Sequence, residues 1–75
     1  MTNKYRVDRA TSTRVPCGMN SIRYIGDSWH EARQAYDLTT AGVDTWGQPN
    51  AAYGVILSIW DSSKNDYIVK CQKGI

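Results

Sequence analysis

Residues 28–41 form the one stretch of this chain with the pattern of an amphipathic helix, and this limits the folds open to it. Ser28 stands three residues before Glu31, the spacing of a capping box, in which each side chain accepts a backbone N–H at the start of the helix. Asp27 and Glu31 also place negative charge at the positive end of the helix dipole. The sequence therefore predicts one helix of at most about four turns.

One face of this helix is predicted to be apolar. Its members recur at helical spacing: Trp29, Ala32, Ala35, Tyr36 and Thr39. We expect Trp29 to lie in the core. Thr39 and Thr40 weaken the last turn because β-branched side chains lose freedom in a helix, and Gly42 is suited to follow the helix end.

Four segments with strand patterns flank the helix, at residues 4–9, 22–25, 53–60 and 67–72. The first alternates polar and apolar side chains, which predicts a strand exposed on one side. Residues 10–21 are rich in turn formers and are predicted to be a loop. The order β-β-α-β-β predicts an α+β fold, with a single helix packed on one face of a small, mainly antiparallel sheet.

The length of the chain allows one domain, residues 1–75, with a modest core. No segment has the apolar core of a signal peptide or the roughly 18 apolar residues of a membrane span. We therefore expect a soluble, cytoplasmic protein without membrane contact. Cys17 and Cys71 are expected to remain reduced thiols in that compartment.

The net charge of +2 conceals a segregation along the chain. Residues 1–26 carry five basic side chains and one acidic one, whereas residues 27–66 carry two basic and six acidic ones. If the N-terminal strands neighbour the last strand, one side of the sheet is basic and the helix side acidic. Such asymmetry steers association with a charged partner, although a mixed soluble surface is the plainer interpretation.

The strand at 53–60 predicts a second apolar surface. Alternation places Tyr53, Val55, Leu57 and Ile59 on one face and Ile56 and Trp60 on the other. Because one helix covers one face, we expect Ile56, Trp60 and Ile68 to stay uncovered beside Lys70 and Gln72. Such a patch marks a protein interface or a homodimer seam, unless residues 10–21 fold across it or the patch is a few tolerated surface residues.

Trp46 lies in a predicted loop beside Gly47 and Pro49. A tryptophan there either packs back on the core or enters a partner, where tryptophan is a frequent hot-spot residue. We expect it to pack back, because a small domain needs its large side chains.

Few residues suggest chemistry. Arginines beside aromatic residues, at 5–7 and 23–24, suit contact with phosphates and bases, but a pI near 8.7 falls short of a strongly basic domain. Cys17 and His30 form no recognisable pair of nucleophile and base, and with Cys71 they lack the spacing of metal ligands. We expect neither enzyme activity nor a cofactor or metal.

The passage from Ile22 to Tyr36, a strand followed by a capped helix, resembles small phage inhibitors of host machinery, including a host RNA polymerase inhibitor and certain type I anti-CRISPR proteins. The hairpin of residues 53–61 and 67–72 is similar in order to the one that closes those anti-CRISPR proteins. The same cap and helix occur in HicB-type antitoxins, which usually have three strands before the helix where this chain shows two. The resemblance implies a non-enzymatic inhibitor that occupies a surface of a larger host protein or ribonucleoprotein complex.

The residues expected to bind the partner are basic or apolar: Arg6, Arg9, Arg14 and Arg23, with Trp46, Ile56 and Trp60 as anchors. An acidic alternative, which would mimic phosphates, comprises Asp37, Asp44, Asp61 and Asp66. Two further functions stay open. They are a small regulator that contacts nucleic acid directly, including a HicB-like antitoxin, and a homodimeric structural component.

Overall fold

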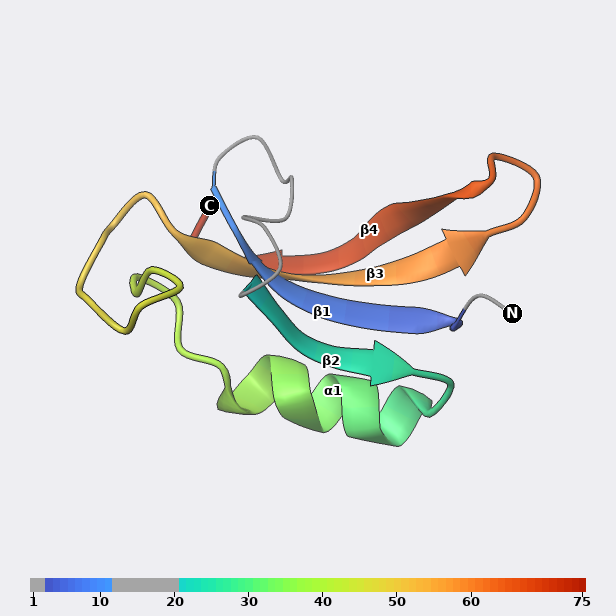
Figure 1. Cartoon of the computed structure of the whole chain (residues 1–75), viewed down its shortest axis with the longest axis horizontal. Helices are drawn as coiled ribbons and strands as arrows, with labels where there is room; N and C mark the ends of the chain where they lie inside the picture. The colour runs from blue at the N-terminus through green and yellow to red at the C-terminus, as the bar shows by residue number, and fades with distance from the viewer. Residues whose placement is uncertain (1–2, 12–20) are drawn as a thin grey trace.

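The computed structural model describes residues 3–11 and 21–75 and has the predicted α+β architecture (Figure 1). Its elements follow one another as β1 (Tyr5–Ala10), β2 (Ile22–Gly26), α1 (Trp29–Leu38), β3 (Gly54–Asp61) and β4 (Asp66–Lys73). The predicted order β-β-α-β-β is therefore confirmed, with element ends displaced by a few residues.

The four strands form one antiparallel sheet in the order β2-β1-β3-β4. Strand β1 is central, because it pairs with β2 on one side and with β3 on the other. The last strand does not neighbour the N-terminal strands, since β3 separates β1 from β4. The expectation of a β1 strand exposed on one side is wrong, because Asp8 is completely buried on the face away from the helix.

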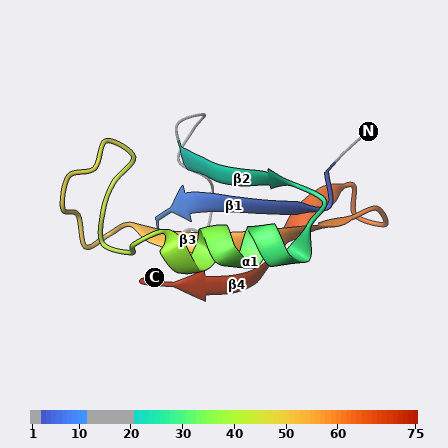
Figure 2. The same cartoon turned by 90° about the horizontal axis from the view of Figure 1, so that it is seen from below.

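The helix packs across β1, β2 and β3 (Figure 2). The core lies beneath it and contains Val7, Ala32, Tyr36, Val55 and Leu57. Val7, Val55 and Leu57 lie on the helix-side face of the sheet, as the alternation in β1 and β3 predicts, and Ala32 and Tyr36 are the buried residues of α1. The other face of the sheet, which the helix does not touch, is called the open face below.

The helix begins as predicted, but its cap uses a third side chain. The Oγ of Ser28 accepts the N–H of Glu31 at 3.2 Å. The reciprocal bond of a capping box is relayed, because the Ser28 N–H donates to the Tyr24 hydroxyl, which in turn donates to Glu31 Oε2, both at 3.2 Å. The start of α1 is thereby tied to the end of β2.

The helix ends at Leu38, three residues earlier than residue 41. Thr39 is already extended, with φ −81° and ψ 123°, and both its N–H and its hydroxyl donate to the carbonyl of Ala35. This double use of one carbonyl closes the helix at a β-branched residue, which favours extended backbone. Gly42, with φ +79°, lies beyond the helix end and begins the next loop.

Trp29 is not a core residue, and this expectation is wrong. It is 42% exposed and makes an edge-to-face contact with the ring of Tyr5, with the centroids 5.4 Å apart. Tyr5 is the first residue of β1, so the first turn of α1 lies over the end of the sheet, where fewer strand residues surround it.

The described part of the chain contains no helix that is long and apolar enough to cross a membrane.

Candidate binding surfaces

The segment 42–53, called the Trp46 loop here, joins the helix to β3 and is closed by backbone hydrogen bonds. The Gly42 N–H donates to the Tyr53 carbonyl, and the Asn50 N–H donates to the Gly42 carbonyl, both at 2.8 Å. Val43 and Pro49 form an isolated antiparallel bridge further along. The base of the loop is therefore ordered like the end of a small hairpin.

Asp44 organises the tip of the Trp46 loop. One oxygen of its carboxylate accepts the N–H groups of Trp46 and Gln48, at 2.9 and 3.0 Å. Its own N–H donates to the Gln48 carbonyl, and its carbonyl accepts the Gly47 N–H. Gly47 supplies the turn, with φ +83°, a conformation that glycine adopts without steric cost.

Trp46 stands at this tip and is 73% exposed. The expectation that it packs back on the core is wrong, because the Trp46 loop extends beyond the end of the sheet (Figure 1). The alternative, that Trp46 is free to enter a partner, agrees with this geometry.

Arg9 fastens the loop to the sheet rather than facing solvent. It is 9% exposed, and its Nη1 donates to the carbonyls of Thr40 and Val43 at 2.7 and 2.9 Å. Its Nε is buried without a hydrogen-bond partner. Burial lowers the pKa of this guanidinium, and the nearby charge of Arg23 acts in the same direction. Arg9 is therefore not an exposed binding residue, because β1 is a central strand.

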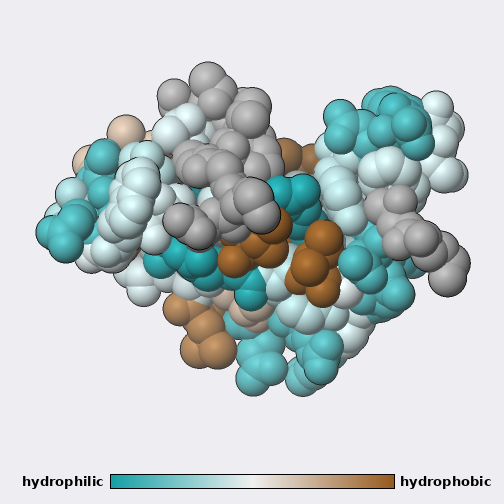
Figure 3. Space-filling view, viewed as in Figure 1, coloured by the Kyte–Doolittle hydropathy of each residue, from teal (hydrophilic) through white to brown (hydrophobic). Residues whose placement is uncertain are grey.

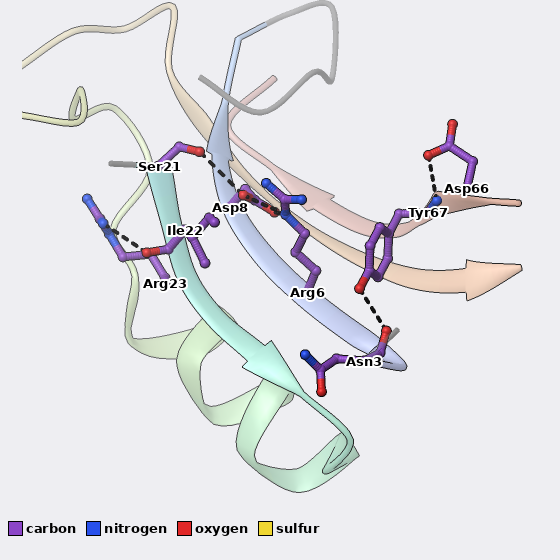
Figure 4. Close-up of polar contacts among 8 residues, drawn as sticks. All are labelled: Asn3, Arg6, Asp8, Ser21, Ile22, Arg23, Asp66 and Tyr67. Atoms are coloured by element: carbon purple, nitrogen blue, oxygen red, sulfur yellow. Dashed lines mark hydrogen bonds and ion pairs between the residues drawn. The ribbon is translucent and has the colours of Figure 1, made fainter. Parts of the chain in front are cut away.

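Arg6 lies on the open face and is paired with the buried Asp8 (Figure 4). Its Nε donates to both carboxylate oxygens at 2.9 and 3.0 Å, and the Ser21 hydroxyl donates to the same carboxylate at 3.3 Å. Burial raises the pKa of Asp8 above its ordinary value, although Arg6 acts in the opposite direction. Arg6 and Arg9 thus lie on opposite faces and do not form one basic surface.

Two aromatic side chains continue this cluster on the open face. The Arg6 guanidinium lies 5.8 Å from the centroid of the Tyr67 ring, and Trp60 meets that ring edge-on at 5.2 Å. The Tyr67 hydroxyl donates to the Asn3 carbonyl at 2.7 Å. Trp60 is half-buried by these contacts, so less of it faces solvent than expected.

Ile56 is only 1% exposed, so the expectation of an uncovered Ile56 anchor is wrong. It is flanked in register by Asp8 and Gln72 in the middle of the sheet. Ile68 does not share its face, because the hairpin turn sets Ile68 opposite Ile59 on the helix side and Tyr67 opposite Trp60. The face on which Ile68 lies depends on the length of the turn between β3 and β4, which alternation within one strand does not specify.

The remaining predicted residues are dispersed. Arg23 is exposed on the edge strand β2, where its Nη1 donates to the Ile22 carbonyl at 3.3 Å. Arg14 and Cys17 lie outside the described residues. Each acidic side chain of the alternative surface has a local partner: Asp37 pairs with Arg33, Asp44 caps the Trp46 loop, Asp61 accepts from Ser63, and Asp66 accepts the Tyr67 N–H.

Sequence reasoning did not single out two exposed apolar residues. Leu38, at the end of α1, is 77% exposed, and Ile25 on β2 is 47% exposed. Figure 3 shows apolar surface over β2 and near the end of α1. Ile25 could have been suspected, because alternation along a strand places it on the face opposite to Tyr24. The only sequence signal for Leu38 is that it lies outside the apolar stripe of α1.

Among residues 3–11 and 21–75, no three His, Cys, Asp or Glu side chains gather as metal ligands would. Cys71 is a half-buried free thiol, with Arg33 Nη1 3.5 Å from its Sγ.

Comparison with known protein families, curated proteins and solved structures finds no significant match to this chain.

Proposed function

We propose that this chain is a non-enzymatic binding protein of the kind that phages direct against their hosts. It would inhibit a larger host complex, of CRISPR-Cas defence or of transcription, by occupying one of its surfaces. The observation that carries the proposal is Trp46, which is 73% exposed at the tip of a loop that is ordered by its own hydrogen bonds.

An ordered loop suits this role for an energetic reason. Binding costs conformational freedom, and a segment already fixed in one conformation loses less of it. Asp44 holds the tip through the N–H groups of Trp46 and Gln48, and Arg9 holds the base through two carbonyls. Tryptophan in turn provides a large, rigid contact surface and dominates many interfaces. The proposal needs no catalytic group.

The test is capture of host proteins on the immobilised chain, with Trp46→Ala compared against Leu38→Ala. Both residues are large, apolar and more than two-thirds exposed, but only Trp46 lies on the loop. We expect Trp46→Ala to weaken binding of the captured complex by about thirtyfold or more, since hot-spot truncations cost at least about 2 kcal/mol. Leu38→Ala should leave it within about twofold of the original, as surface changes outside a hot spot do.

Inhibition is then measured on the purified complex as its activity against added chain. Loss of activity at stoichiometric chain, restored by Trp46→Ala, supports the proposal. Equal capture by both variants contradicts the role of the loop. Capture that disappears after nuclease treatment, with a steep dependence on salt, would instead indicate direct binding to nucleic acid.

A further inference from the structure

The Trp46 loop is almost free of charged side chains. Among residues 42–53, Asp44 is the one charged residue, although 21% of the whole chain is charged. Residues 46–52 are all exposed, and they comprise tryptophan, glycine, glutamine, proline, asparagine and alanine. Charged residues are usually frequent on protein surfaces, whereas the centres of protein interfaces are poor in them and rich in aromatic residues. The composition of the loop is therefore that of an interface centre.

The carboxylate of Asp44 faces the backbone of its own loop. One of its oxygens accepts two backbone N–H groups of the tip, and the residue is half-buried. Two cations near the base of the loop are also engaged elsewhere. Arg9 is buried against two carbonyls, and the Nζ of Lys73, at the end of β4, lies 4.8 Å from the centroid of the Tyr36 ring. Trp46 is thus presented among neutral groups.

The charged turn between β3 and β4 lies at the other end of the molecule (Figure 1). It is bounded by Asp61 and Asp66 and contains Lys64. The molecule is 35 Å long. Exposed charges are screened beyond about 8 Å at physiological ionic strength, so those of the turn contribute little to the potential at Trp46.

The indole N–H of Trp46 is the polar group of this side chain. Within residues 3–11 and 21–75, no group accepts a hydrogen bond from it. A tryptophan that becomes buried usually finds a partner for its N–H. A surface that encloses the ring therefore needs one acceptor, such as a backbone carbonyl, among otherwise apolar walls.

We propose that the Trp46 loop binds an uncharged, apolar recess in the surface of a partner protein, with one acceptor for the indole N–H. Burial of the ring supplies the affinity, so the segregated charges of the chain do not select the partner. This inference rests on the proposed binding function and names the chemistry of the surface that the Trp46 loop would occupy.

The first test uses β-cyclodextrin, a ring of neutral sugars whose apolar cavity can enclose an indole, and its derivatives with sulfated or amino-substituted rims. Binding to the full chain is followed through the indole N–H signals in NMR spectra. We expect the three probes to bind at Trp46 with affinities within about twofold of one another at about 0.15 M salt, where distant charges are screened. Trp46→Ala should lose this binding, and Leu38→Ala should keep it.

The second test uses the host complex captured by the immobilised chain. Gln48→Glu and Gln48→Lys place a charge of either sign beside Trp46 and keep the two backbone hydrogen bonds between Gln48 and Asp44. Both should weaken capture by about tenfold or more, because a charge that enters an apolar recess unpaired loses its hydration. The same two changes at Gln34, an exposed glutamine of α1, are the matched control and should stay within about twofold of the original.

Two further measurements separate the ring from its N–H and from charge. Trp46→Phe keeps an aromatic ring without the N–H, so its capture should lie between those of the unchanged chain and Trp46→Ala. Capture by the unchanged chain should stay constant within about twofold from about 0.1 to about 1 M salt, although the screening length falls from about 10 to about 3 Å.

A preference of about tenfold or more for one charged cyclodextrin overturns the inference. So do opposite effects of Gln48→Glu and Gln48→Lys: tighter capture by Gln48→Glu indicates a basic recess, and tighter capture by Gln48→Lys indicates an acidic surface or nucleic acid. The cyclodextrin test remains decisive if the Gln48 variants loosen the loop, which amide hydrogen exchange of Asn50 would show.

The two proposals fail in different ways. If Trp46→Ala captures the complex normally, the proposed function fails and this inference fails with it. If capture still requires Trp46 but depends on the sign of the charge at Gln48, this inference alone is overturned.

Discussion

At the scale of single residues, the carboxylate of Asp8 is a charged group that burial makes unfavourable in the fold. Its pKa is raised by burial, more than Arg6 lowers it, so the ionised form is less favourable in the folded chain than in the unfolded chain. The stability that Asp8 contributes is therefore present below the ordinary carboxyl pKa of 3.8 and is lost as the pH rises through its folded pKa.

Asp8→Asn removes this titration. We expect the stability of the variant, relative to the unchanged chain, to improve as the pH rises from about 3.8 and to level off once Asp8 is ionised in the folded state. Urea denaturation at a series of pH values measures the difference, with Asp37→Asn as an exposed control. A difference that is constant with pH, or that moves against the variant as the pH rises, would contradict the account.

At the scale of elements, the β2–α1 junction depends on the hydroxyl of Tyr24. It accepts from the Ser28 N–H and donates to Glu31, so one oxygen joins the strand to the helix cap. A Cβ on Gly26 would clash with the same hydroxyl, so a larger residue at this position would have to displace the Tyr24 side chain. The relay differs from a two-residue capping box, in which Glu31 would bond to the Ser28 N–H itself.

Tyr24→Phe should destabilise the fold by about 1 kcal/mol in total, since each of its two hydrogen bonds contributes about 0.5 kcal/mol, the lower end of the usual range. In a background of Glu31→Ala the same change should cost about half as much, because one of the two bonds is already lost. Thermal or urea unfolding of the four chains of this double-mutant cycle gives both values. Strictly additive costs would show that the hydroxyl does not couple the cap to β2.

At the scale of the whole molecule, local patterns predicted the helix and the strands, whereas pairing between distant segments decided which side chains are buried. The cap at Ser28 and the alternation of Val55 and Leu57 are properties of single segments, and both were found as expected. Arg9 and Ile56 are buried because β1 and β3 are central in the sheet, and alternation within a strand does not specify strand order. The prediction that Trp46 packs on the core was wrong because the hydrogen bonds that order a loop leave no periodic pattern in the sequence.

The buried guanidinium of Arg9 joins the core strand β1 to the base of the Trp46 loop. Arg9→Met keeps much of the length of the side chain and removes the hydrogen bonds to the carbonyls of Thr40, just before the loop, and Val43, within it. We expect amide hydrogen exchange of Gly42, Asp44 and Asn50 to become about tenfold faster, as loss of about 1.4 kcal/mol of local stability implies.

The same variant should weaken capture of the partner although Trp46 is unchanged, because a loosened loop must be ordered again on binding. Trp46→Ala should show the opposite separation, with weak capture but normal exchange at the loop base. Normal exchange in Arg9→Met would show that the loop orders itself through Asp44 alone. Faster exchange with unimpaired capture would remove the energetic argument that an ordered loop is what makes Trp46 a binding residue.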